Sequence, residues 1–284
     1  MGMVMLKLLE RNIASVEQRL VLLAPPNTEV PASFTNVTVD AGRHERLMQR
    51  MQRLRGSIYL QDGAVQREQL SSDGLHQTPE DLHSWHLLML NKDREVSSCA
   101  WYMEHDTRSS IQELRVRNCP LSRVETWREK LRIAVESELA SARRDRLKYA
   151  EVGGWAVSKQ SRCTSEGLML ALAAYSLSRM MGGALGITTA TVRHSSSTIL
   201  RRLGGSSLEA DGCAVPPYYD PKYKCEMELL RFDSRKPSPK YSSLIDLLRE
   251  KLTWVSVVAT PDAASFQFSR SQTAPASFHP VFAA

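Results

Sequence analysis

The sequence predicts an α/β fold, of the α+β kind, in which a mixed β-sheet is flanked by helices. Short strand-type runs alternate with longer helical stretches along most of the chain. Residues 164–181 are apolar on nearly all sides, which indicates a helix enclosed within a domain. The composition, with 42% hydrophobic and 24% charged residues, is that of a globular protein. A length of 284 residues suits one large domain with additional ends.

The first element is predicted to be an amphipathic helix. Apolar residues recur at spacings of three and four from Leu6 to Leu23, and Pro25 and Pro26 must end the helix. Its apolar stripe can pack on the same chain, which we favour, or on a second copy in a homodimer. We therefore divide the chain into an N-terminal helix (1–26), a catalytic-type domain (27–255) and a flexible C-terminal tail (256–284).

The next segments alternate between strand and helix patterns. Residues 61–81 are polar and predict a long loop, a length that is usually functional or disordered. Residues 122–144 begin with the capping-box pattern of Ser122 and Glu125. The predicted strands are 35–39, 85–90, 96–103, 149–157, 185–191 and 225–232. The predicted helices are 43–59, 122–144, 164–181, 195–203 and 242–252.

Charge and cysteine content narrow the class of protein. The formal charge of +6, from 37 basic and 31 acidic residues, favours acidic partners such as coenzyme phosphates or an acidic carrier protein. The five cysteines are scattered and form no C-x-x-C pair, so a disulfide scaffold or zinc ribbon is not expected, and we predict no metal site. No apolar run reaches the ~20 residues of a membrane helix, and the start lacks an export signal. We expect a soluble cytoplasmic protein without a membrane span.

The stretch from Glu151 to Gly167 carries the clearest functional signal. It leads from a strand through a polar loop into the apolar helix. The unpaired N–H groups at such a helix start bind phosphate, Gly167 allows close approach of a ligand, and Arg162 adds a positive charge. An ordinary strand-to-helix turn remains the alternative from these residue types alone.

At this point the sequence resembles the coenzyme-binding motif of the GNAT acyltransferase superfamily, Gln/Arg-x-x-Gly-x-Gly/Ala. Arg162, Ser165 and Gly167 stand in register, with serine in place of the first glycine. The order of elements from Arg43 to Phe232 also matches the GNAT core. The resemblance implies an acyl thioester of coenzyme A or acyl carrier protein as co-substrate, with no permanently bound cofactor. It places the thioester on Trp155, Val157, Arg162, Thr164, Ser165 and Gly167.

Within the superfamily the chain is similar to acyl-homoserine-lactone synthases and N-acyl amino acid synthases. Their pattern Glu-x-Ser-Arg-Phe/Trp-Ala-Val corresponds to residues 151–157, where Glu151, the aromatic residue and Ala-Val agree. Gly153 and Gly154 replace the Ser-Arg pair, which argues against the homoserine-lactone substrate. The resemblance implies transfer of a medium or long acyl chain to the amine of an amino acid or related small amine.

Other functions stay open at this stage. Acetyl transfer from acetyl-CoA is one, and a non-catalytic GNAT-like module that binds a thioester or a protein is another. Nucleic-acid binding through the basic residues 43–55 is disfavoured, because the basic residues alternate with apolar ones that a core requires.

The resemblance also suggests roles in catalysis. Glu151 suits the base that takes the proton of the amine, directly or through water. Gly153 and Gly154 suit a β-bulge that frees backbone N–H groups for the developing oxyanion. The general acid for the departing thiolate is left open among His194, Tyr218, Tyr219 and Tyr223.

A looser match concerns a helix with an arginine and an acidic, aromatic loop that closes over the site in these relatives. Arg55, Tyr59, Asp73 and the segment from Asp81 to Trp85 are the counterparts here. No catalytic role is assigned to them.

Overall fold

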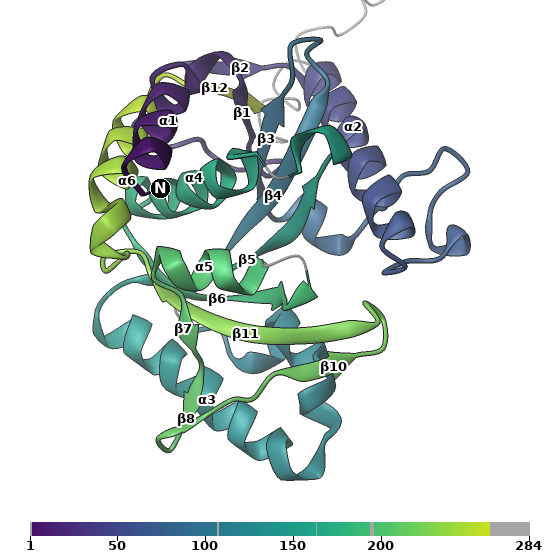
Figure 1. Cartoon of the computed structure of the whole chain (residues 1–284), viewed down its shortest axis with the longest axis vertical. Helices are drawn as coiled ribbons and strands as arrows, with labels where there is room; N and C mark the ends of the chain where they lie inside the picture. Colours follow the sequence, from purple (N-terminus) through teal and green to yellow (C-terminus); the bar gives the residue numbers. More distant parts are fainter. Residues whose placement is uncertain (1, 107, 163, 194–195, 262–284) are drawn as a thin grey trace, which may run out of the picture.

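The computed structural model describes residues 2–106, 108–162, 164–193 and 196–261 (Figure 1). Its centre is a ten-stranded sheet in the order β10-β11-β6-β5-β4-β3-β1-β12-β2, with the short β7 also paired to β11. The main strands are β1 (Leu20–Leu23), β2 (Val37–Val39), β3 (Trp85–Leu90), β4 (Val96–His105), β5 (Lys148–Val157), β6 (Ala184–Thr191), β11 (Cys225–Asp233) and β12 (Ser256–Ala259). The short ones are β7 (Ser206–Ser207), β8 (Glu209–Ala210), β9 (Cys213–Ala214) and β10 (Tyr218–Asp220).

The sheet is mixed. β5 and β6 run parallel, as do β1 and β12, and β12 and β2. The pairs β1–β3, β3–β4, β4–β5, β6–β11 and β10–β11 are antiparallel. This confirms the predicted fold class.

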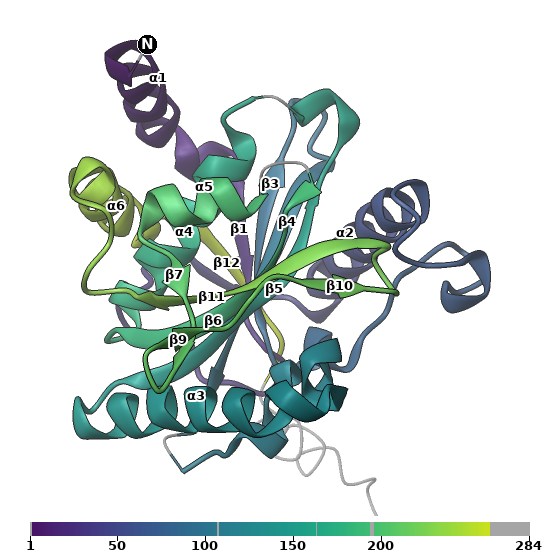
Figure 2. The same ribbon diagram turned by 60° about the horizontal axis from the view of Figure 1, so that its bottom comes forward.

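Helices cover both faces of the sheet (Figures 1 and 2). They are α1 (Gly2–Ala14), α2 (Ala41–Gln61), α3 (Glu125–Arg144), α4 (Glu166–Met180), α5 (Ser196–Leu203) and α6 (Pro239–Leu252). One face packs against α2 and α3, and we call it the α2–α3 face. The opposite face packs against α1, α4, α5 and α6, and we call it the α4 face.

Helix α4 is the most enclosed helix of the α4 face. Leu170, Leu172 and Leu177 are fully buried, and the helix packs against strands of the sheet as well as α6. A helix that is apolar all round needs such a position, because any side left in water would expose apolar surface. The prediction made from its sequence is confirmed.

The predicted N-terminal helix was wrong in its second half. The helix ends at Ala14, and residues 20–23 form β1 between β3 and β12. All four residues of β1 are buried, since the strand has neighbours on both sides and cores on both faces. A short run that is apolar at every position is compatible with a buried helix or a buried strand. Here the residues form a strand because they pair with β3 and β12. Leu9 and Ile13 are buried in the core of the same chain, which confirms the favoured packing partner of the helix.

The predicted tail begins later than expected. Ser256–Ala259 is strand β12, which lies between β1 and β2 and buries Val257 and Val258 completely. Its two partners lie more than two hundred residues earlier in the chain, so no local pattern indicates them. Residues 262–284 of the predicted tail lie outside the described residues.

The capping box predicted at Ser122 was also wrong. The Ser122 hydroxyl donates to the carbonyl of Cys119, and α3 begins at Glu125 without a side-chain cap.

In the described part of the chain no helix is both long and apolar enough to cross a bilayer.

Candidate active site

The strands β5 and β6 separate halfway along their length. Their parallel ladder runs from Lys148 opposite Ala184 to Val152 opposite Thr188. Both strands continue beyond this point, β5 to Val157 and β6 to Thr191, without further pairing to each other. Backbone groups on these inner edges therefore have no ladder partner in the neighbouring strand, and a gap opens in the middle of the sheet.

A β-bulge helps to bend β5 away from β6. The register between β4 and β5 shifts between Cys99 and Trp101, opposite the glycine pair. Gly154 has a φ of +65°, and a Cβ built there would lie 2.2 Å from Cδ1 of Trp101. A Cβ on Gly153 would lie 2.5 Å from Cζ2 of the same ring. The two glycines therefore make room for the buried Trp101 as well as forming the bulge.

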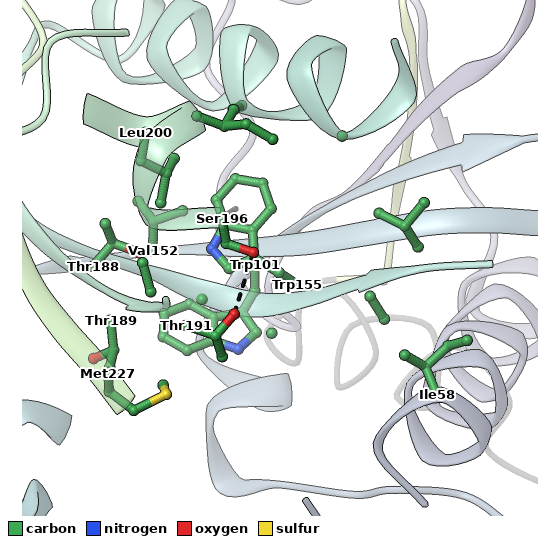
Figure 3. Close-up of a pocket in the computed structure, with 18 of the residues that line it drawn as sticks. Ile58, Trp101, Val152, Trp155, Thr188, Thr189, Thr191, Ser196, Leu200 and Met227 are labelled. Atoms are coloured by element: carbon green, nitrogen blue, oxygen red, sulfur yellow. Dashed lines mark hydrogen bonds between the residues drawn. The ribbon is translucent and has the colours of Figure 1, made fainter. Parts of the chain in front are cut away.

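A cleft of about 1440 Å³ occupies this gap. Its lining includes residues 153–157 of β5 and 188–191 of β6, so the cleft is continuous through the plane of the sheet. Figure 3 shows Val152, Trp155 and Leu200 around one part of it, with Met227 and Thr189 on another side. The cleft thus gives two reactants access to one point from opposite faces of the sheet.

The start of α4 forms the wall of the cleft on the α4 face. Thr164, Ser165, Glu166 and Gly167 all line it. Within 4 Å, a Cβ added to Gly167 would meet only the side chain of Val157, at 3.9 Å, so this part of the helix start is open. The first N–H groups of a helix have no intrahelical acceptor, and the helix dipole is positive at this end. This wall therefore suits a phosphate.

Ser165, which departs from the coenzyme motif, and the following Glu166 have partners of their own. The hydroxyl of Ser165 accepts a hydrogen bond of 2.7 Å from the side chain of Asn12 on α1. Glu166 accepts from Ser97 at 2.9 Å and forms an ion pair with Arg19. Both side chains are thereby held toward the N-terminal segment, a contact that local sequence patterns did not indicate.

Arg162 lines the cleft but is already engaged. Its guanidinium forms an ion pair of 3.2 Å with Asp62, the residue that ends α2. The backbone carbonyl of Asp62 also accepts a bond of 3.0 Å from Arg193. A ligand phosphate at Arg162 therefore competes with a carboxylate, which lowers its net gain in binding free energy. Trp155 and Val157, also predicted on the donor side, line the cleft as well.

Glu151 is buried at the wall of the α2–α3 face, and its carboxylate accepts three hydrogen bonds. The donors are Nε2 of His105 at 3.0 Å, the backbone N–H of Arg115 at 2.8 Å and that of Val116 at 3.0 Å. Glu151 thus holds the start of the short 3₁₀ helix Arg115–Asn118 against the sheet. Glu151 also lines the cleft. On one side it anchors this helix, and on the other it borders the cleft.

The tyrosines proposed as general acids divide into two groups. Tyr218 and Tyr223 line the cleft, whereas Tyr219 is 60% exposed and does not contribute to the lining. Burial raises the pKa of both Tyr218 and Tyr223, so each phenol keeps its proton near neutral pH. His194 lies outside the described residues.

The long loop is fastened to α2 by a buried ion pair. Arg55 and Asp81 are 1% and 3% exposed, and they meet in a bidentate contact with N···O distances of 2.8 and 2.7 Å. The Arg55 guanidinium also donates to the carbonyl of His76. Two of the counterparts noted in the sequence are therefore in contact. Asp73 contributes only a backbone carbonyl, which accepts from Arg53 at 3.5 Å.

Sequence reasoning missed most of the wall on the α2–α3 face. It noted Tyr59 only loosely and did not single out Trp101, Arg115 or Lys222, which line the cleft from four separate segments. A fifth lining residue, Glu80, forms an ion pair of 3.1 Å with Arg115. No spacing along the chain brings these residues together, so only the fold reveals their neighbourhood.

The mixed sheet, the gap between β5 and β6 and the helix that starts beside it are the arrangement expected from the resemblance of the sequence to GNAT enzymes. No protein-family model matches the chain, and the comparison with curated proteins also finds no match. Among solved structures, the chain is similar to BjaI, a CoA-dependent acyl-homoserine lactone synthase determined with SAM and isopentyl-CoA. The identity is 15%, the TM-score is 0.49, and the match covers 88% of this chain and 99% of that one.

Two further similarities are of the same kind. FeeM, an N-acyl amino acid synthase from uncultured soil microbes, is 12% identical with a TM-score of 0.43, over 70% of this chain and 89% of that one. TofI, determined in a ternary complex with an inhibitor and MTA, is 13% identical with a TM-score of 0.47, over 82% and 99%.

Proposed function

We propose that the protein is an N-acyltransferase that moves an acyl group from a thioester of coenzyme A or acyl carrier protein to the amine of an amino acid or a related small amine. The observation that carries this proposal is the single cleft through the sheet at the β5–β6 gap. A helix start suited to phosphate lies on one face, and Glu151 with two protonated tyrosines lies on the other.

The donor enters from the α4 face. Its phosphates bind the N–H groups at the start of α4, near Gly167, and Arg162 exchanges Asp62 for a phosphate oxygen. The pantetheine arm is long and polar in the manner of a peptide, and it lies in the gap where β5 and β6 no longer pair. The free backbone groups there replace the hydrogen bonds that the arm makes in water.

The acyl chain lies along the apolar wall of the α4 face. Leu8, Leu168, Ile199 and Leu200 line the cleft there. A small chamber adjoins this wall and is bordered by Val152, Ala171, Ala174 and Tyr175, among others. The size of the wall favours a medium or long acyl chain, because each CH₂ group that is buried contributes about 0.8 kcal/mol to the free energy of binding.

The reaction is a direct transfer. The amine nitrogen attacks the carbonyl carbon of the thioester, a C–N bond forms, and the oxygen becomes an oxyanion that backbone N–H groups at the gap stabilise. The C–S bond then breaks, and the departing thiolate takes a proton from Tyr218 or Tyr223. Before the attack the ammonium loses one proton to Glu151 through a water molecule, since the Glu151 oxygens already accept three bonds. The second proton, which the nitrogen loses as the amide forms, returns to the tyrosine that protonated the thiolate.

A second candidate is a GNAT-like module that binds a thioester without turning it over. The two engaged side chains favour it, because Glu151 is occupied by three donors and Arg162 by Asp62. Acetyl transfer remains the alternative within the enzyme class, as it uses the same cleft with a shorter acyl group.

Turnover separates these functions. Purified protein is incubated with acetyl-, butyryl-, octanoyl- and palmitoyl-CoA and with acyl carrier protein loaded with the same acyl groups, each with a panel of amino acids and amines. Free thiol and acyl-amide are followed by mass spectrometry. We expect amide formation with octanoyl or palmitoyl donors. Silence in every pairing, with donor binding intact, would leave the non-catalytic module, and a preference for acetyl-CoA would identify an acetyltransferase. We place this activity in the cytoplasm.

A further inference from the structure

Two positive side chains face the cleft on the side of the sheet opposite the start of α4. They are Arg115, from the short 3₁₀ helix after β4, and Lys222, from the turn between β10 and β11. Each lies over an aromatic ring. The Cζ atom of Arg115 is 5.4 Å from the centre of the Trp101 ring, and Nζ of Lys222 is 5.5 Å from that of Tyr223.

The guanidinium of Arg115 is held in place but has donors to spare. Its Nε pairs with Oε1 of Glu80 at 3.1 Å, and its plane is supported by the Trp101 ring. A guanidinium carries five N–H donors in a rigid fork that matches a carboxylate. The side chain is 38% exposed toward the cleft, so a ligand can reach the remaining donors.

Lys222 has no such partner. In the ranges that the structure describes, no carboxylate oxygen lies within 4.0 Å of its ammonium group. Asp220 lines the same cleft, but its Oδ1 accepts a bond of 2.8 Å from the backbone N–H of Lys222. Among the described residues Lys222 therefore has no ion pair, and its ammonium group borders the cleft.

Arg115 and Lys222 lie close enough to affect one another, with Glu80 and Asp220 also nearby. Partial burial and then the charge of Arg115 lower the pKa of Lys222. Burial, followed by the charges of Arg55 and Lys222, lowers the pKa of the neighbouring His76 to about 4. Burial is the first cause of both shifts, and the neighbouring positive charges act in the same direction.

The same wall connects directly to the reaction centre. The backbone N–H of Arg115 donates to Glu151, so the arginine and the proposed base are fixed to one another. In an α-amino acid the carboxylate and the amine are separated by a single carbon. A carboxylate bound at Arg115 therefore keeps the amine close to Glu151 and to the gap.

We infer that the acceptor is an α-amino acid with a free carboxylate, which Arg115 and Lys222 bind together. The aromatic rings of Tyr59, Trp101 and Tyr223 line the rest of this wall and suit an apolar or aromatic side chain. This inference rests on the proposed function and adds that the acceptor must carry a carboxylate. Donor phosphates are not its ligand, because the helix start that suits them lies on the other face.

The test compares amino acids with the amines that lack only the carboxylate. Tyrosine is paired with tyramine, tryptophan with tryptamine and leucine with isoamylamine, with octanoyl- or palmitoyl-CoA as the donor. For each pair the ratio of kcat/KM for the amino acid to kcat/KM for the amine is measured at one pH. We expect a ratio of roughly 10 to 100 in the wild-type protein, the size of one or two hydrogen bonds to a charged group.

Variants assign the preference to the two side chains. Lys222→Met and Arg115→Gln should each lower the ratio about tenfold, and Lys222→Arg should retain most of it. The ratio cancels any general loss of folding or of donor binding, since both acceptors are measured on the same protein. Lys224→Met is the matched control, because it removes the same charge two residues away, outside the cleft lining, and should leave the ratio unchanged.

The outcomes separate this inference from the proposed function. If the wild-type protein acylates amines as well as amino acids, or if neither variant changes the ratio, the inference is overturned and acyl transfer stands. If no donor gives product with any acceptor, the proposed function fails and the inference fails with it.

Discussion

The carboxylate of Glu151 accepts the backbone N–H of Arg115 at 2.8 Å, so the proposed base and the loop that carries the cleft arginine form one unit. Burial of Glu151 is compensated by this bond together with those from Val116 and His105. A change at Glu151 therefore affects the shape of the acceptor wall as well as proton transfer, and experiments must separate the two effects.

Glu151→Gln should reduce both stability and activity. The amide nitrogen of glutamine cannot accept a hydrogen bond, so either Val116 loses its acceptor, or His105 and Arg115, which share Oε2, both lose theirs. A buried donor without a partner costs about 1–3 kcal/mol, which urea unfolding can measure. If Glu151 is also the base, acyl transfer in the variant should recover as the pH rises, because the amine then loses its proton unaided. A pH-independent loss would limit Glu151 to its structural role.

Gly154→Ala should destabilise the sheet at the gap. The new Cβ would lie 2.2 Å from the Trp101 ring, in a residue with a φ of +65°. Overpacking of this kind costs about 1–3 kcal/mol, in addition to the backbone strain. Gly212→Ala is the control, since Gly212 has a φ of +75° but nothing within 4 Å of its added Cβ. Equal losses in the two variants, measured by urea unfolding, would show that contact with Trp101 does not matter.

Arg55→Met should be strongly destabilising. It leaves Asp81 buried and without its bidentate partner, and loss of one member of a buried pair costs about 3–5 kcal/mol. The double variant Arg55→Met with Asp81→Leu should recover part of the loss, because no unpaired charge remains. Chemical unfolding of the wild type, Arg55→Met, Asp81→Leu and the double variant gives the coupling directly. A double variant that is less stable by the sum of the two single losses would contradict this account.

Stability should fall as the pH is lowered from about 6.5 to about 4. Burial lowers the pKa of both His76 and His86 to about 4, while both titrate near 6.5 in the unfolded chain. The unfolded state therefore binds more protons throughout this interval, and the free energy of unfolding decreases. His86→Gln should make the decrease shallower, whereas His83→Gln, at an exposed position, should not. Stability that stays constant across the interval would contradict the burial of the two neutral rings.

Arg162 and Asp62 should have opposite effects on donor binding. Arg162→Ala removes a phosphate partner and should weaken coenzyme A binding about tenfold. Asp62→Asn releases Arg162 from its ion pair and should strengthen the same binding. Calorimetric titration with coenzyme A measures both constants. Weaker binding in both variants would assign the ion pair a structural function instead.

Local patterns in the sequence predicted the central part of the fold well. The stretch from residue 149 to residue 203 has strands and helices close to the predicted bounds, because each segment has a clear period and its ends carry glycine or polar residues. The strands β1 and β12 were missed. Each is short, and their pairing joins the two ends of the described chain, which no local window contains.

The candidate site, like the fold, was predicted only in part. The motif residues Arg162, Ser165 and Gly167 lie within six residues of each other, and their place around the start of α4 could be predicted from spacing alone. The partners that constrain them, Asn12 and Asp62, come from distant helices. Arg115 and Lys222 were missed for the same reason, since the pocket wall they form exists only once the sheet and its loops are assembled.

The most direct test of the central claim is a crystal structure with a non-hydrolysable acyl-CoA thioether. We expect phosphates at the start of α4 and the pantetheine arm between residues 153–157 of β5 and 188–191 of β6, with the acyl carbonyl facing the wall that holds Glu151. A coenzyme bound elsewhere, with the gap between β5 and β6 filled by side chains, would contradict it.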